Sequence, residues 1–118
     1  MIKLVSLKRS KDFQTILKEK RLNSNYFTMF YGKSLTNKKN EKMNKLNISF
    51  ITKKKIGNAV KRNKIKRRLR FAVQKLIKER NKINLDLTYV IIAKSNIFED
   101  KFSEIFYQIR NAFYKAKC

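Results

Sequence analysis

The densest candidate chemistry in this 118-residue chain lies in residues 53–70, KKKIGNAVKRNKIKRRLR, which hold ten Lys or Arg and no Asp or Glu. Arginine offers a planar fork to two phosphate oxygens, and lysine offers a point charge. Asn63 can donate to or accept from a ribose hydroxyl or a base edge. Like charges repel at helical spacing, and a merely solvated helix face usually mixes signs. The run therefore predicts a surface for a polyanion, with a solubilising charge run as the plain alternative.

The whole chain carries the same bias, with 31 Lys plus Arg against 8 Asp plus Glu and a formal net charge of +23. Self-repulsion of this size opposes compaction and a polyanion relieves it, so nucleic acid is the first partner to consider. Composition alone does not separate RNA from DNA. A membrane partner would require an exposed apolar helix face or an anchor, and no apolar run approaches the roughly 20 residues that span a bilayer. We expect no membrane partner and a cytoplasmic location.

Residues for catalysis by the chain itself are missing from this sequence. Histidine, the commonest general acid or base, is absent, and Cys118 is the only cysteine, so no Cys or His pair can hold a metal. We expect no catalytic residue and no metal site in the chain, so a partner would have to carry any reaction. The acidic residues are scattered: Asp12, Glu19, Glu41, Glu79, Asp86, Glu99, Asp100 and Glu104.

A long helix is predicted to position the basic run. Gly57 interrupts the chain, Asn58 is a good N-cap, and the helical pattern runs to about Lys82. The apolar residues of this segment step by four, three, one, three and one, which indicates one buried stripe. The stripe consists of Ile65, Leu69, Ala72, Val73, Leu76 and Ile77.

The opposite side of this helix carries polar residues, so the two sides can serve different purposes. A helical wheel places Asn63, Arg67 and Arg70 roughly opposite the apolar stripe, with Arg68 on one edge of the outer face. Phe71 also falls on the outer side. It would either pack under a neighbouring loop or stack on RNA.

Two shorter helices are predicted at the ends of the chain. Ser10 is a plausible N-cap for residues 11–20, where Phe13, Ile16 and Leu17 recur at helical spacing. A C-terminal helix is indicated by a second inward stripe. That stripe consists of Phe102, Ile105, Phe106, Ile109 and Phe113.

The remaining apolar segments have the pattern of strands. Residues 26–31 and 46–52 alternate in β-favouring types, and the continuous apolar run 87–94 is typical of a central strand buried on both faces. Residues 36–45 are polar and aperiodic, which predicts a flexible loop. The fold class is therefore α+β, a single-domain α/β sandwich over residues 1–118, in the order αβββαβα with helices packed on a small mixed sheet. The general rule predicts a right-handed crossover if the strands that flank the long helix are parallel.

The segment KKIGNAVKRNKIKRRLR resembles the RNR motif of the bacterial ribonuclease P protein family, in which a lysine pair, Gly-Asn-Ala-Val, Arg-Asn, a basic residue and Lys-Arg-x-x-Arg follow in this register. LKRSKDFQTILK resembles the opening helix of the family, and TYVIIAK resembles its strand after the basic helix. The resemblance covers nearly the whole chain. It implies an α/β sandwich whose crossover through the basic helix is left-handed, against the general rule.

The resemblance also implies a function. Members of the family bind a large catalytic RNA, which cuts the 5′ leader from precursor tRNA. The reaction uses Mg²⁺ that is bound mainly by the RNA. The protein also binds the leader. The protein would be a monomer alone, with one copy per RNA. Lys64 stands where arginine is commoner, so only its charge carries over. The implied RNA-binding residues are Lys54, Lys55, Arg62, Asn63, Lys64, Lys66, Arg67 and Arg70.

The leader cleft of the family, between the first helix and the sheet, would fall on Phe13, Leu17 and Tyr31 here. Stacking of unpaired bases on aromatic rings tolerates many sequences, which suits a varied leader. Leu17 lies where the family often has an aromatic residue, so stacking there is weaker or absent. From the residues alone, Phe13 and Tyr31 are more typical of a core.

Two other functions fit parts of the sequence. A structural RNA-binding module without a nuclease partner would need the same basic helix but no leader cleft. A nuclease that acts without RNA would need a metal site or an acid/base pair, and the scattered carboxylates do not supply one.

Overall fold

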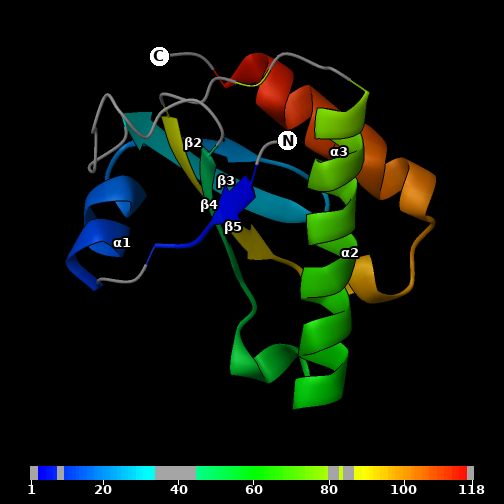
Figure 1. The fold of residues 1–118 in the computed structure, drawn as a ribbon. Coiled ribbons are helices and arrows are strands. Elements are labelled where there is room, and N and C mark those ends of the chain that lie inside the picture. The colour runs from blue at the N-terminus through cyan, green and yellow to red at the C-terminus, as the bar shows by residue number, and fades with distance from the viewer. Residues whose placement is uncertain (1–2, 8–9, 34–44, 80–82, 84–86, 117–118) are drawn as a thin grey trace.

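The computed structural model describes residues 3–7, 10–33, 45–79, 83 and 87–116 (Figure 1). The predicted loop 36–45 and the predicted helix end at 80–82 therefore lie almost wholly outside the described residues. The helices are α1 (Ser10–Leu17), α2 (Ala59–Lys78) and α3 (Phe102–Lys115), with two short 3₁₀ helices, η2 (Lys54–Ile56) and η3 (Ser95–Phe98). The strands are β1 (Lys3–Val5), β2 (Lys20–Asn23), β3 (Phe27–Lys33), β4 (Lys45–Ile51) and β5 (Leu87–Ala93).

The five strands form one mixed sheet in the order β1-β4-β5-β3-β2. β4 pairs in parallel with β1 and β5, whereas β3 pairs antiparallel with β5 and β2. β5 occupies the centre, and six of its seven residues are buried, because helices cover both faces of the sheet there. The predicted central strand and the α+β class are confirmed.

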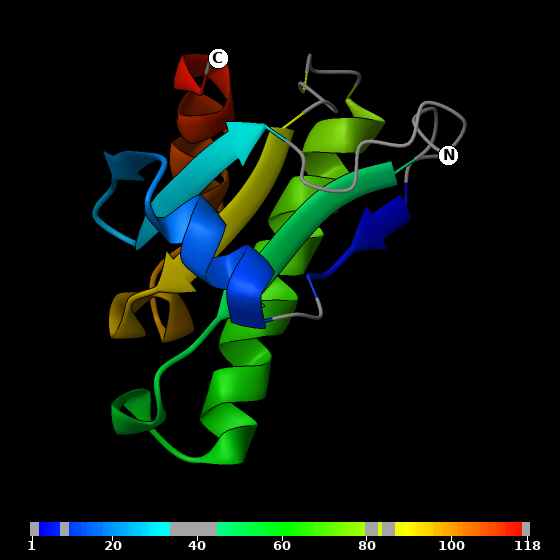
Figure 2. The ribbon, with the colours of Figure 1, turned by 90° about the vertical axis from the view of Figure 1, so that its left-hand side faces the viewer.

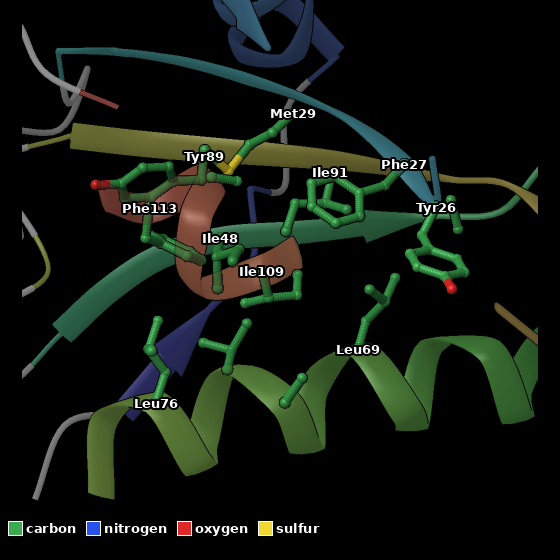
Figure 3. Packing of buried hydrophobic residues seen from close by; sticks show 14 of the residues in the cluster. Tyr26, Phe27, Met29, Ile48, Leu69, Leu76, Tyr89, Ile91, Ile109 and Phe113 are labelled. Atoms are coloured by element: carbon green, nitrogen blue, oxygen red, sulfur yellow. The ribbon is translucent and has the colours of Figure 1, made fainter. Parts of the chain in front are cut away.

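The main core lies between the sheet and the pair α2 and α3. Figure 3 shows Met29, Tyr89 and Ile91 of the sheet pointing toward these helices. The rings of Tyr89 and Phe113 lie 4.7 Å apart between centroids. The buried residues of α2 are Ile65, Leu69, Ala72, Val73 and Leu76, five of the six residues in the predicted stripe.

A smaller contact lies on the other face of the sheet, which α1 crosses in Figure 2. Ile16 and Val90 are both fully buried, yet neither belongs to the main cluster. Thus α1 seals only part of this face, while α2 and α3 cover the opposite one.

The crossover from β4 through α2 to β5 is left-handed. In Figure 2, β4 and β5 run toward the lower left, α2 lies behind the sheet, and β5 lies to the left of β4. This agrees with the family resemblance, and the right-handed prediction from the general rule is wrong here. The general preference arises where a twisted strand feeds directly into a crossover. Here the chain first runs on past the sheet through η2, which relaxes that constraint.

The predicted order held a third strand before α2 that had not been placed on the sequence, and β2 is that strand; of the described strands only β1 lies outside the predicted order, and the first helix is shorter than expected. α1 ends at Leu17 instead of residue 20, and Lys20 begins β2. β2 has the sequence KRLN and β1 has the sequence KLV. Strands this short and this polar carry no usable alternation, and charge on edge strands also discourages pairing with other chains.

Arg68 fastens η3 to α2, although the sequence placed it on the outer face. Its guanidinium donates to the backbone carbonyls of Ile97 at 2.9 Å, Phe98 at 3.0 Å and Asp100 at 2.6 Å. Burial raises the pKa of the nearby Tyr26 phenol, and a hydrogen bond with the Asp100 carboxylate raises it further. The half-buried Arg68 is thus a structural residue that fixes the segment after β5.

Arg68→Ala should lower the free energy of unfolding by about 1–3 kcal/mol, because carbonyls that accept from a charged donor lose it. Arg67→Ala, at the exposed neighbouring position, should change it by less than about 0.5 kcal/mol. Urea denaturation of both variants measures the difference. Equal losses would mean that the three carbonyls do not depend on Arg68.

Candidate nucleic-acid interface

The start of α2 is built by local hydrogen bonds. Asn58 is the N-cap as predicted, and its Oδ1 accepts from the Lys61 backbone N–H at 2.9 Å. Arg62 Nε donates to the Gly57 carbonyl at 3.1 Å. These bonds hold η2 against the first turn of α2, and so they set where the lysines of η2 lie relative to the helix.

The predicted RNA-binding residues lie on η2 and along α2, away from the buried stripe. Arg62 and Lys66 are half-buried, and the other six are exposed. α2 contains no acidic residue between Ala59 and Lys78, so none on the helix itself neutralises this side. We call the exposed set the basic face: Lys54, Lys55, Asn63, Lys64, Arg67 and Arg70.

Aromatic rings lie beneath several of these cations. The Nζ atoms of Lys64 and Lys61 lie 4.6 and 5.1 Å from the centroid of the Phe98 ring. The Arg70 guanidinium lies 6.0 Å from the Phe50 ring. A ring face attracts a cation without neutralising it, so the charge remains available to phosphate. Phe98 was missed because it lies far along the chain, on the segment that Arg68 holds.

An open pocket of about 510 Å³ lies beside η2. It joins the start of α2 to the face of the sheet that α1 covers, because Thr28 of β3 and Ile92 of β5 are paired neighbours there. Lys94 Nζ donates to the Ser24 carbonyl at 2.7 Å. Four of the lining residues belong to the basic run 53–70, and of these only Lys55 is among the implied RNA-binding residues. The lining consists of Thr28, Lys53, Lys55, Ile56, Lys61, Ile92, Ala93, Lys94 and Ser95.

Phe13 and Leu17 lie one turn apart on α1. Phe13 is half-buried, and the Leu17 side chain is 38% exposed. They flank Ile16, which is fully buried against the sheet. Both side chains therefore lie at the margin of the contact between α1 and the sheet, where part of each surface is open.

Tyr31 lies on the other face of the sheet, contrary to its expected position in a cleft with α1. Its side chain is 6% exposed and belongs to the main core, beside its register partner Tyr89. The preceding residue, Phe30, is half-buried and faces α1, because successive strand residues alternate between faces. Gly32, two residues after Phe30 and so on the same face of β3, supports this assignment. A Cβ at Gly32 would lie 2.6 Å from Cγ of Glu19, which follows α1.

The described residues contain no group of three or more His, Cys, Asp or Glu side chains that could hold a metal ion. Mg²⁺ takes oxygen ligands, mostly carboxylates and phosphates. The donor set of the described residues therefore does not fit a protein-borne Mg²⁺ site. In the part of the chain that the structure describes, no helix is long and apolar enough to cross a membrane.

Comparisons with known proteins agree with this geometry. The family model for ribonuclease P matches residues 1–117. The ribonuclease P protein component of Streptococcus pneumoniae is 37% identical over 97 residues, which cover 82% of this chain and 72% of that protein.

Solved structures show the same fold. The RNase P protein from Thermotoga maritima superposes with a TM-score of 0.72 at 22% identity, over 97% of this chain and 99% of that one. The RNase P protein of Staphylococcus aureus superposes with a TM-score of 0.68 at 23% identity, over 93% and 92% of the two chains. With a family model matched over nearly its full length and a relative at 37% identity, the chain belongs to the family of bacterial ribonuclease P protein components, the protein subunits of an RNA-based endoribonuclease.

Proposed function

We propose that this chain, acting as one domain, binds the catalytic RNA of ribonuclease P through the basic face and the 5′ leader of precursor tRNA along the sheet face under α1. The observation that carries the proposal is the acid-free basic face, which leads directly into a lysine-lined pocket that opens onto the sheet. One RNA can follow α2 while a second, single-stranded RNA follows the sheet.

The basic face suits a folded RNA. Arg67 and Arg70 are exposed and can bind two phosphate oxygens each, while Lys54 and Lys55 supply point charges at the helix start. Asn63 lies among them and can meet a ribose hydroxyl. Each neutralised phosphate releases counterions, so binding should weaken steeply with salt.

The pocket and the sheet face suit a single strand. Lys53, Lys61 and Lys94 line the pocket with Lys55, and together they can follow the backbone of an unpaired leader. Phe13 and Phe30 supply ring surface on the α1 side of the sheet, so Phe30 replaces Tyr31 in this proposal. Recognition by charge and stacking accepts many leader sequences.

The chemistry of cleavage falls to the RNA in this proposal. Mg²⁺ would be held mainly by RNA phosphates, and when bound there it would supply an activated water and stabilisation of developing negative charge. The protein lowers the repulsion between two RNA chains and orients the leader at its proposed binding face. No catalytic residue is assigned to this chain.

The direct test is multiple-turnover cleavage of a precursor tRNA at low Mg²⁺ by a bacterial catalytic RNA, with and without this protein. Cleavage should rise sharply only when both components are present, and the protein alone should cleave nothing. If the RNA gains nothing over a range of salt concentrations, the chain would instead be a structural RNA-binding module.

Arg67→Ala should weaken binding to the catalytic RNA and lower the slope of log affinity against log salt by about one, because one phosphate contact is lost. Lys115→Ala removes an exposed charge at the end of α3 and should leave the slope unchanged. Filter binding at four salt concentrations measures both. Identical slopes for the two variants would remove Arg67 from the interface.

Phe30→Leu and Phe13→Leu should each weaken binding of precursor tRNA to the holoenzyme by about 1–3 kcal/mol, the range for one stacked base. Binding of mature tRNA, which has no leader, should stay nearly constant. Tyr31→Leu serves as the control, since it should reduce stability without this selectivity. Equal losses for both tRNAs would contradict the assignment of Phe13 and Phe30 to the leader.

A further inference from the structure

Phe71 is an exposed aromatic residue in the middle of α2 that the proposed contacts leave unused. Its side chain is 59% exposed, although phenylalanine is a residue that folding normally buries. One side of the ring meets Phe102 of α3, with centroids 5.2 Å apart and planes tilted by 42°. Phe71 is therefore supported from one side and open on the other.

A row of rings continues from Phe71 onto α3. Phe102 and Phe106 stack with centroids 6.3 Å apart and planes 18° apart. Lys75 Nζ lies 5.1 Å from the centre of the Phe106 ring, and the Arg110 guanidinium lies 6.0 Å from it. The far end of the row thus already has cations over its ring face, whereas the Phe71 end is exposed. We call Phe71, Phe102 and Phe106 the aromatic row.

The aromatic row adjoins the basic face. Phe71 follows Lys64 by seven residues and Arg67 by four, and residues at these spacings share one side of a helix. Lys75 and Lys78 continue the same side by one and two further turns, and Figure 1 shows α3 beside this part of α2. A ligand that follows the cations of the basic face therefore reaches the ring of Phe71 next.

The surroundings select the kind of ligand. A purely apolar partner would have to bury Arg67 and Lys78 without a counter-charge, which is costly. RNA offers both parts of the match, phosphates for the cations and the π face of an unpaired base for the ring. Glu79, the residue that follows α2, pairs with Lys75 at 2.7 Å, so its charge is already engaged.

We propose that Phe71 stacks on an unpaired base of the catalytic RNA and extends the interface beyond the basic face toward the C-terminal end of α2. Phe102 supports the ring and sets its tilt. This inference rests on the proposed function, because the base belongs to the RNA that the basic face would bind.

The chain contains no tryptophan, so Phe71→Trp introduces a single reporter at this position. Its emission should be strongly quenched when the catalytic RNA binds, because stacking brings the indole against a base. Trp placed at Tyr114, an aromatic residue that is 74% exposed at the end of α3, is the matched control and should change little. Phe71→Trp should also keep the affinity of the original chain.

Phe71→Leu keeps an apolar contact with Phe102 but removes the aromatic face. It should lower affinity for the catalytic RNA by about tenfold, within the range for one stacked base. The salt dependence should keep its slope, because no phosphate contact is lost. An unchanged slope distinguishes the loss of a stacking contact from the loss of a cation, because removal of a cation lowers the slope of log affinity against log salt.

Three results would overturn the inference. The first is binding of the catalytic RNA by Phe71→Leu within twofold of the original chain, and the second is unchanged emission of the Phe71→Trp variant at saturating RNA. The third is that both variants lose affinity and their melting temperatures fall in parallel, which would mean that the loss reflects unfolding. The original chain serves as the reference for the proposed function. If it binds the catalytic RNA no better than an unrelated RNA of equal length, both proposals fall together. If it binds well and only the Phe71 results fail, the proposed function stands and the stacking site does not.

Discussion

The structure depends on how α2 tolerates its own charge. One side of this helix is held in the core by five buried residues, while its sequence carries Lys and Arg without a single acid. Repulsion between such neighbours opposes the helix, and the fold disposes of part of the charge. The Arg68 guanidinium is engaged by three backbone carbonyls, whereas the ammonium groups of Lys61 and Lys64 lie over the Phe98 ring and keep their charge available to phosphate. The charge that remains is directed outward, where a polyanion would offset it.

The connection between the parallel strands β4 and β5 places this charge next to the sheet. Because β4 and β5 are neighbours and parallel, the chain must leave the end of β4, pass through η2 and return along α2 before it enters β5. That path brings the lysines at the start of α2 to the end of β5, where the pocket joins them to Thr28 and Ile92. One connection therefore brings together a surface suited to structured RNA and a surface suited to a single strand. The proposed division between catalytic RNA and leader follows from this arrangement.

The sequence predicted the parts of the fold that repeat a signal over many residues. The stripe of α2, the N-cap Asn58 and the continuous apolar run of β5 each had a clear physical origin, and the family resemblance added the handedness. β1 and β2 were too short and polar to show a period. The face of β3 was ambiguous because both of its sides are apolar, so only the register with β5 and the approach of Glu19 to Gly32 distinguish Phe30 from Tyr31. Arg67 and Arg68 are adjacent and alike, and the difference between them depends on carbonyls about 30 residues away.

The most direct test of the account is a residue-by-residue measurement of lysine reactivity toward an acylating reagent, by mass spectrometry, in the protein alone and in its complex with the catalytic RNA. We expect strong protection at Lys54, Lys55 and Lys64, which lie on the basic face, and unchanged reactivity at Lys33 and Lys115, which are exposed on other elements. Protection at Lys33 and Lys115, with the lysines of the basic face still reactive, would contradict the claim that α2 is the RNA-binding surface.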